Sequence, residues 1–242
     1  MKVLSLFQDN SRKRIAQLID PDKFVESKLI NQIENANKAE VDFIFVGGSL
    51  ISNNAINECM QIIKKHTNIP IVLFPGNVTH IHNDADAILF LSLISGRNAD
   101  LLIGNHVHVA LSIKNSSLES IPTGYLLIES GKITSAQYMS NSLPIPRDKI
   151  DIAVATAVAG ELLGHKTIYM DGGSGAENII SEEMITSVKS EISIPLIIGG
   201  GIRDTQTAIR IAKAGADIIV VGNAAEENPE LIIDIANSVH TI

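Results

Sequence analysis

The sequence predicts an α/β protein with the (β/α)8 TIM-barrel fold, in which eight parallel strands alternate with helices. Three observations favour this fold class. A chain of 242 residues is of normal length for one such barrel, strand-like apolar runs recur with helix-like segments between them, and most of the runs are continuous, as in strands covered on both faces. We find neither an internal repeat nor a linker, so we expect a single domain over residues 1–242.

Eight apolar runs are the expected strands. They cover residues 14–19, 43–46, 71–74, 87–91, 123–128, 167–170, 196–198 and 218–221. Helical periodicity covers residues 53–66, 148–163, 182–191 and 205–214, and Asp204 is suited to cap the last of these helices. The helix signal is weak after the third strand, so we expect the helix there to be modified or missing. Residues 131–147 are expected to form an inserted loop.

Composition and charge limit the classes of partner. The formal net charge of −8 argues against a nucleic-acid partner, which favours a basic surface. No signal peptide is apparent, and no apolar run reaches the roughly 20 residues needed to span a bilayer. We expect a cytoplasmic homo-oligomer, with peripheral membrane contact still compatible with the sequence. Cys59 lies in a helical pattern and is expected to be a buried structural thiol.

Glycine-rich turns follow the last three expected strands. Glycine lets backbone N–H groups face an anion without a Cβ in the way, and a helix expected after the first of these turns would add its N-terminus. Because the carboxyl ends of barrel strands converge on one face, the three turns together predict one phosphate site. The turns contain Gly172, Gly173, Ser174 and Gly175, then Gly199, Gly200 and Gly201, then Gly222 and Asn223.

Oxygen-bearing side chains follow the first two strands. Asp20 comes directly after the first strand, and Ser49 follows the glycine pair after the second. A carboxylate and a hydroxyl at the mouth of a barrel are ligands that suit Mg²⁺. Each residue alone could instead cap the helix that follows it, but their position on adjacent strands favours a magnesium site.

Two histidine pairs, His80 with His82 and His106 with His108, have a spacing that occurs in zinc sites. Neither pair has an obvious third ligand, so we expect solvated or helix-end histidines. Apart from Lys13, at the edge of the first strand, no expected strand carries a lysine. A Schiff-base mechanism is therefore not indicated.

The combination of these motifs resembles the geranylgeranylglyceryl phosphate synthase family, which includes the PcrB-like heptaprenyl enzymes of bacteria. The resemblance covers nearly the whole chain, and the first motif is similar to that of the family's second group. It rests on Leu18-Ile19-Asp20-Pro21-Asp22-Lys23, Val46-Gly47-Gly48-Ser49, Leu73-Phe74-Pro75-Gly76-Asn77, Pro122-Thr123-Gly124-Tyr125, the segment 169–175, Gly199-Gly200-Gly201-Ile202-Arg203 and Val221-Gly222-Asn223.

This resemblance implies a Mg²⁺-dependent prenyltransferase that joins geranylgeranyl diphosphate to the C3 hydroxyl of sn-glycerol 1-phosphate in ether-lipid biosynthesis. Asp20 and Ser49 would bind Mg²⁺ at the diphosphate. Asp171 stands where many members have Glu, so a base there is one methylene shorter, and Leu18 replaces a Lys found in some members. The glycerol phosphate would be held by Tyr169, Met170, Asp171, Gly172, Gly173, Ser174, Gly175, Gly200, Gly201, Gly222 and Asn223.

In the expected mechanism Asp171 accepts or orients the proton of the attacking hydroxyl. Tyr125 is a second catalytic candidate, because its ring could face an allylic cation or its hydroxyl could bind substrate; the alternative is a core tyrosine. The apolar runs 88–91 and 101–103 could line a groove for a C20 chain, or could pack as ordinary core. Alternative functions are a phosphosugar isomerase or aldolase-like barrel, and a non-catalytic flavin- or phosphate-binding barrel.

Overall fold

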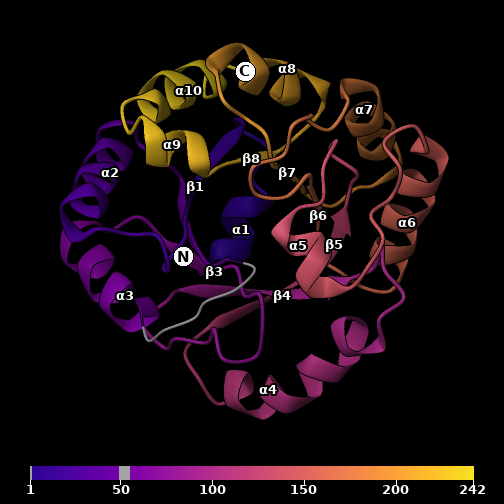
Figure 1. Cartoon of the computed structure of the whole chain (residues 1–242), viewed down its shortest axis with the longest axis horizontal. Coiled ribbons are helices and arrows are strands. Elements are labelled where there is room, and N and C mark those ends of the chain that lie inside the picture. Colours follow the sequence, from indigo (N-terminus) through magenta and orange to yellow (C-terminus); the bar gives the residue numbers. More distant parts are fainter. Residues whose placement is uncertain (1, 49–54) are drawn as a thin grey trace.

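The computed structural model describes residues 2–48 and 55–242 and contains a closed barrel of eight parallel strands (Figure 1). Each strand pairs with the next in chain order, and the last pairs with the first. The predicted (β/α)8 TIM-barrel fold is confirmed. The strands are β1 (Arg14–Ile19), β2 (Phe43–Val46), β3 (Ile71–Leu73), β4 (Ala87–Leu93), β5 (Glu119–Leu127), β6 (Thr167–Asp171), β7 (Leu196–Gly199) and β8 (Ile218–Val221).

Helices form an outer ring around the strands (Figure 1). The longer ones are α2 (Glu26–Lys38), α3 (Ala55–His66), α4 (Asn105–Lys114), α6 (Ile150–Leu162), α7 (Glu182–Glu191), α8 (Thr205–Ala214) and α10 (Leu231–Val239). The short ones are α1 (Val3–Phe7), α5 (Ser135–Ser140), α9 (Asn223–Glu227) and the π-helical turn η1 (Asp100–Gly104) that leads into α4. Helix α1 lies inside the ring, where Phe7 packs edge to face on Phe43.

The predicted helices agree with the structure in most places. Helices α7 and α8 match their predicted ranges, and Asp204 caps α8 by accepting a hydrogen bond from the Thr207 amide at 2.7 Å. Helix α6 lies within its predicted range, and α3 fills the described part of residues 53–66. The segment between β3 and β4 contains no helix, as predicted.

The interpretation of residues 131–147 as a loop is wrong in part, because α5 forms within them. Thr134 caps this helix by accepting a hydrogen bond from the Gln137 amide, and Asn141 ends it in the left-handed conformation with φ of 48°. A helix of six residues is too short for hydrophobic periodicity to reveal it.

Alternate residues of each strand pack in two different layers. In β2, Phe45 points into the barrel, whereas Ile44 packs against the helices outside, and both are fully buried. Burial on both faces explains why the strand sequences are continuous apolar runs. In β6 the same alternation places Tyr169 inside the barrel and Met170 outside it.

The structure also tests the predictions for Cys59 and for membrane-spanning segments. Cys59 is fully buried in α3, as predicted, and burial raises the pKa of its thiol to about 12. Within the described ranges, no helix has both the length and the apolar character needed to cross a membrane.

Candidate active site

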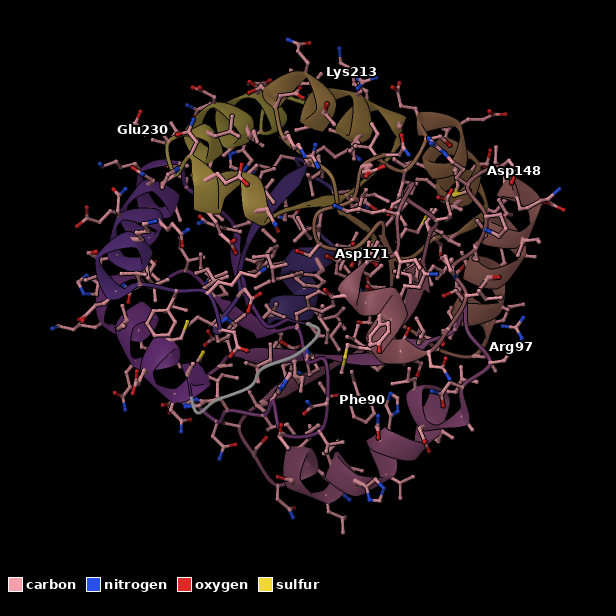
Figure 2. All side chains as sticks on the ribbon, in the orientation of Figure 1. Phe90, Arg97, Asp148, Asp171, Lys213 and Glu230 are labelled. Atoms are coloured by element: carbon pink, nitrogen blue, oxygen red, sulfur yellow. The ribbon has the colours of Figure 1, made fainter. Side chains whose placement is uncertain are left out.

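A cavity of about 1090 Å³ opens at the carboxyl ends of the strands. Polar turns after β1, β6, β7 and β8 form one side of it, and apolar side chains of β4, η1, α4 and α5 form the other. In Figure 2, Asp171 lies near the centre of the barrel mouth and Phe90 lies toward α4. Since (β/α)8 barrels carry their catalytic residues at this end, the cavity is the candidate active site.

Asp171, the last residue of β6, is buried beside the cavity. Its Oδ2 atom accepts a hydrogen bond from the Tyr125 hydroxyl at 2.6 Å, and its Oδ1 atom accepts one from the Gly173 amide at 2.7 Å. Burial raises the pKa of Asp171, although both hydrogen bonds act in the opposite direction. The two residues predicted to be catalytic are thus in direct contact, and the carboxylate has the raised proton affinity that suits a general base.

Aromatic rings surround this pair. The Phe74 ring, from the turn after β3, stacks on Tyr169 with centroids 5.1 Å apart, and Tyr125 meets Tyr169 edge to face at 5.5 Å. Tyr125 and Tyr169 are buried, whereas Phe74 is half-buried. Burial and the Asp171 carboxylate raise the pKa values of both tyrosines well above 10.0, so both hydroxyls stay protonated near neutral pH.

The glycine turns after β6 and β7 lie against each other. Gly200 has a φ of +90°, and a Cβ at this position would come within 2.8 Å of the Gly172 nitrogen, so only glycine fits. The Gly172 amide donates a hydrogen bond to the Gly199 carbonyl oxygen at 3.0 Å, and the Gly173 amide is bonded to Asp171. The first bond joins the two turns and the second fixes the Asp171 carboxylate, so both amides are used within the protein instead of pointing at an anion.

One expectation for the turn after β6 is wrong, because it does not lead into a helix at Gly175. Helix α7 begins only at Glu182. In between, the amides of Glu177 and Asn178 donate hydrogen bonds to the Ser130 carbonyl oxygen at 3.1 and 2.9 Å. These bonds hold the segment against the loop that follows β5, so a helix N-terminus does not contribute to the turn.

Most of the residues predicted to bind glycerol phosphate line the cavity. The Ser174 hydroxyl donates a hydrogen bond to Asn223 Oδ1 at 2.9 Å, which joins the turns after β6 and β8. Met170 and Gly172 do not line the cavity, and the Met170 side chain lies outside the barrel because residues alternate along a strand. The residues that line it are Tyr169, Asp171, Gly173, Ser174, Gly175, Gly200, Gly201, Gly222 and Asn223.

Asp20 lines the cavity directly after β1. Its Oδ2 atom lies 2.9 Å from the Lys23 ammonium, and its Oδ1 atom accepts a hydrogen bond from the Asp22 amide at 3.1 Å. Asp20 does not cap the next helix, because α2 begins at Glu26. Ser49, the second predicted metal ligand, lies outside the described residues.

The surroundings of Asp20 suit a Mg²⁺ ion that is shared between the protein and a substrate. They do not suit a metal ion that is bound by protein side chains alone. Mg²⁺ is commonly bound by one or two carboxylates together with phosphate oxygens of a substrate. The Asp20 carboxylate faces the cavity, where such a substrate would supply the remaining oxygens. In the part of the chain that the structure describes, no group of three or more His, Cys, Asp and Glu side chains could hold a metal ion.

Cations that border the cavity were missed by the sequence analysis. The position that a Cβ would take at Gly175 lies 3.6 Å from the Lys132 ammonium. Arg203 lines the same region and donates a hydrogen bond to the Ala176 carbonyl oxygen at 2.9 Å. Arg203 lies two residues after the last glycine of a predicted turn and could have been found from that position. Lys132 could not, because its location depends on how the segment after β5 folds.

The apolar arm of the cavity lies between β4 and α4. All four residues of the predicted run 88–91 line it, but Leu101 is the one residue of the run 101–103 that does. Leu93, Val109, Ile113 and Met139 add to the apolar wall. A chain of methylene and methyl groups bound here would be removed from water over most of its length.

The expectation of solvated or helix-end histidines holds in part: His106 lies in the first turn of α4, but His80 and His106 are both buried and not solvated. His106 is buried in the apolar arm, where its ring meets Phe90 edge to face at 4.5 Å and its Nε2 atom lies 3.3 Å from the Ser92 hydroxyl. His80 is buried and accepts a hydrogen bond from the Gly76 amide at Nδ1. Burial lowers the pKa of both imidazoles, so each is neutral near pH 7.

The cavity thus combines a polar half, an apolar arm and a buried carboxylate near the junction of the two. Pockets with a few placed polar groups in an apolar lining are typical ligand sites. At the carboxyl ends of a closed (β/α)8 barrel, this arrangement defines an enzyme that brings a polar substrate and a long apolar substrate together.

Comparison with known proteins agrees with this class. The model of the PcrB family matches residues 8–240. A protein of Chitinophaga pinensis named geranylgeranylglyceryl phosphate synthase is 50% identical over 242 residues, which cover 99% of this chain and 96% of that protein. A protein of the same name from Korarchaeum cryptofilum is 40% identical, with 93% of this chain and 92% of that protein covered. The chain belongs to the PcrB family.

Solved structures give the same result. The (S)-3-O-geranylgeranylglyceryl phosphate synthase of Thermoplasma acidophilum, in complex with sn-glycerol-1-phosphate, has a TM-score of 0.94 at 33% identity, and each chain is covered completely. The enzyme of Thermoplasma volcanium has a TM-score of 0.93 at 35% identity, covering 100% of this chain and 99% of that one. The predicted family and activity class, a prenyltransferase, are confirmed.

Proposed function

We propose that this protein joins geranylgeranyl diphosphate to the C3 hydroxyl of sn-glycerol 1-phosphate, giving geranylgeranylglyceryl phosphate for ether-lipid synthesis. One observation carries this proposal: the glycine turns and the apolar arm line the same cavity, and the hydrogen-bonded pair of Asp171 and Tyr125 lies beside it. The apolar arm distinguishes it from the phosphosugar isomerase and aldolase-like alternatives, whose substrates have no long hydrocarbon chain. The names of the relatives agree with it.

Glycerol phosphate binds in the polar half of the cavity in this proposal. The turns after β6, β7 and β8 surround its phosphate, with Gly201 and Gly222 among the residues in reach. Lys132 and Arg203 add positive charge beside the turn after β6. The net charge of the chain is −8, so a phosphate is attracted by these local groups and not by the molecule as a whole.

The diphosphate binds beside β1, where Asp20 and Lys23 line the cavity. Asp20 would hold Mg²⁺ there, and Ser49 remains the predicted second ligand. When bound, Mg²⁺ would stabilise the negative charge that grows on the diphosphate as it leaves. Lys23 is near enough to Asp20 to contribute a second positive charge to the same group.

The transfer step takes place near Asp171. The bond between C1 of the prenyl chain and the diphosphate oxygen breaks, and its electron pair leaves with the diphosphate. The C3 oxygen of glycerol phosphate forms the new bond to C1, and its proton passes to Asp171. The Tyr125 hydroxyl and the Gly173 amide fix the carboxylate from two sides, and each carboxylate oxygen keeps a lone pair for the substrate hydroxyl.

A transfer assay tests this function. Radiolabelled geranylgeranyl diphosphate is incubated with the protein, Mg²⁺ and either sn-glycerol 1-phosphate or sn-glycerol 3-phosphate. We expect labelled product with the sn-1 isomer alone, loss of product when EDTA removes the metal, and slower transfer from a C35 than from a C20 diphosphate. Absence of product with both isomers at saturating Mg²⁺ would refute the proposed reaction.

Self-association, peripheral membrane contact and a cytoplasmic location remain predictions. Ile103, Val107 and Leu111 are spaced four residues apart on η1 and α4, and all three are exposed. Residues at this spacing share one helix face. Either a second copy or a lipid surface would remove this apolar row from water.

A further inference from the structure

Among the three aromatic residues beside the cavity, Phe74 has the largest exposed fraction. Phe74, Tyr125 and Tyr169 all line the cavity, but the two tyrosines are 8% and 1% exposed, whereas Phe74 is half-buried. Its ring is stacked on Tyr169 with an interplanar angle of 24°. One face of Phe74 therefore packs on Tyr169. Because Phe74 is half-buried and lines the cavity, we infer that its other face borders the cavity.

The substrate sites of the proposed function bring the reacting carbon to this group of rings. The proposed diphosphate site is on β1, the glycerol phosphate site is on β6 to β8, and the apolar arm starts at β4, so the three converge over the middle of the barrel. There the floor is aromatic: the centroid of Phe74 lies 5.1 Å from that of Tyr169 and 6.0 Å from that of Tyr125. Tyr125 in turn bonds Asp171, which places the acceptor of the hydroxyl proton at the edge of the same floor.

Phe74 can contribute to catalysis only through its ring, because it has no group that donates, accepts or coordinates. The face of a benzene ring carries partial negative charge and attracts a cation placed above it. As the bond from C1 to the diphosphate breaks, positive charge develops on C1 and spreads over the allylic carbons. No such charge exists in the bound substrate, so attraction to the ring lowers the barrier without tightening substrate binding.

We propose that the cavity-side face of Phe74 stabilises the allylic cation formed during prenyl transfer, which makes Phe74 a catalytic residue of this reaction. The inference rests on the proposed function. Tyr169, stacked beneath Phe74, supports the ring in position, and Tyr125 serves chiefly through its hydroxyl on Asp171. This assignment differs from the sequence-based expectation that Tyr125 itself faces the cation.

Fluorinated phenylalanines at position 74 test this role. Each added fluorine withdraws electron density from the ring face while nearly preserving its shape, so the chain still folds. Across a series from one to three fluorines, we expect the single-turnover rate of transfer to fall stepwise, by about tenfold to thirtyfold in all. We expect unchanged affinities for sn-glycerol 1-phosphate and for an unreactive thiolo analogue of the diphosphate.

A matched series at Phe43 is the control. Phe43 is also packed against other rings, but it is fully buried inside the barrel and does not line the cavity. Its fluorination should leave the rate unchanged. A flat series at Phe74, or a fall that follows the melting temperature or substrate affinity, would overturn the proposal. Failure of the unsubstituted protein to form product would instead count against the proposed reaction itself.

Discussion

Asp171 shows how two neighbours set the chemistry of one residue. Burial favours the protonated carboxyl, while the Tyr125 hydroxyl and the Gly173 amide favour the carboxylate. Because burial is the larger effect, the pKa of Asp171 lies above the ordinary value of 3.8. A base that must be ionised loses activity as the pH falls through its pKa, so the acid limb of the pH profile reports on Asp171.

Replacing Tyr125 by Phe removes one of the two contacts that lower the pKa of Asp171. The pKa should rise further, and the acid limb of kcat/KM should move to higher pH. A pH profile of the Tyr125→Phe variant measures this shift. Tyr138→Phe serves as the control, because Tyr138 is exposed and does not line the cavity. An acid limb that stays in place or moves to lower pH would contradict the role assigned to Tyr125.

Site residues near the ends of strands could be predicted from the sequence, whereas those on other segments could not. Asp171 ends β6 and Asp20 directly follows β1, while Tyr169 lies two residues before the end of β6, and the barrel places all strand ends at one face. The contact of Tyr125 with Asp171 could not be predicted, because it depends on how far β5 extends beside β6. Lys132 lies on a segment whose path the sequence pattern does not specify.

The glycine turns act as one element, since the turn after β7 rests on the turn after β6. Gly200→Ala would strain a backbone with φ of +90° and push a Cβ to 2.8 Å from the Gly172 nitrogen. We expect the affinity for sn-glycerol 1-phosphate, measured by calorimetry, to fall at least about tenfold, alongside a loss of stability of about 1–3 kcal/mol.

The Gly164→Ala variant distinguishes the effect of backbone strain from the effect of displacing the turns after β6 and β7. Gly164 also has a positive φ, of +100°, but a Cβ there has no neighbour within 4 Å, and it does not line the cavity. This variant should lose stability through strain alone and keep its affinity for glycerol phosphate. Equal losses of affinity in both variants would show that the packing of the two turns has no special part in binding.

At the level of elements, apolar runs predicted all eight strands because each strand is buried on both faces. Helix α2 was not predicted, because Gln32 and Asn35 are among its buried residues and interrupt the apolar periodicity. The helix expected after Gly175 was wrong, because hydrogen bonds to Ser130 hold that segment against the loop after β5. Such long-range contacts leave no local pattern in the sequence.

At the level of the whole molecule, the candidate active site and a charged network lie at opposite ends of the barrel. The cavity is at the carboxyl ends of the strands, and the charged network is at their amino ends. Asp42, just before β2, accepts hydrogen bonds from Arg12, Arg14 and His240 at 2.8, 2.8 and 2.9 Å, and from the Ile15 amide at 2.9 Å. These contacts tie the C-terminal segment to the first two strands. The amino-terminal end of a barrel commonly serves stability in this way.

Asp42→Asn should destabilise the fold while leaving catalysis intact. It removes one of the two carboxylates paired with buried Arg14, since Asp9 remains in place, and it weakens the bonds that Asp42 accepts from Arg12 and His240. We expect the free energy of unfolding to fall by about 1.5–3 kcal/mol, which urea denaturation measures. The hydrogen bonds hold the pKa of Asp42 below its ordinary value, so its contribution is present above pH 3.8 and disappears as the pH falls through the lowered pKa. The variant should therefore lose less stability than the wild type in acid. Asp234→Asn is the control, because Asp234 is exposed. If Asp42→Asn reduced turnover at unchanged substrate affinity, the charged network would have a part in catalysis, contrary to this expectation.

In the proposed reaction, Asp171 takes the proton of the glycerol hydroxyl at the junction of the two substrate sites. The most direct test is the single-turnover rate of prenyl transfer by Asp171→Asn, measured with the affinity of the same variant for sn-glycerol 1-phosphate. We expect the rate to fall by about 10²- to 10⁴-fold while the affinity for sn-glycerol 1-phosphate changes little. A variant that transfers the prenyl group as fast as the wild type would contradict it.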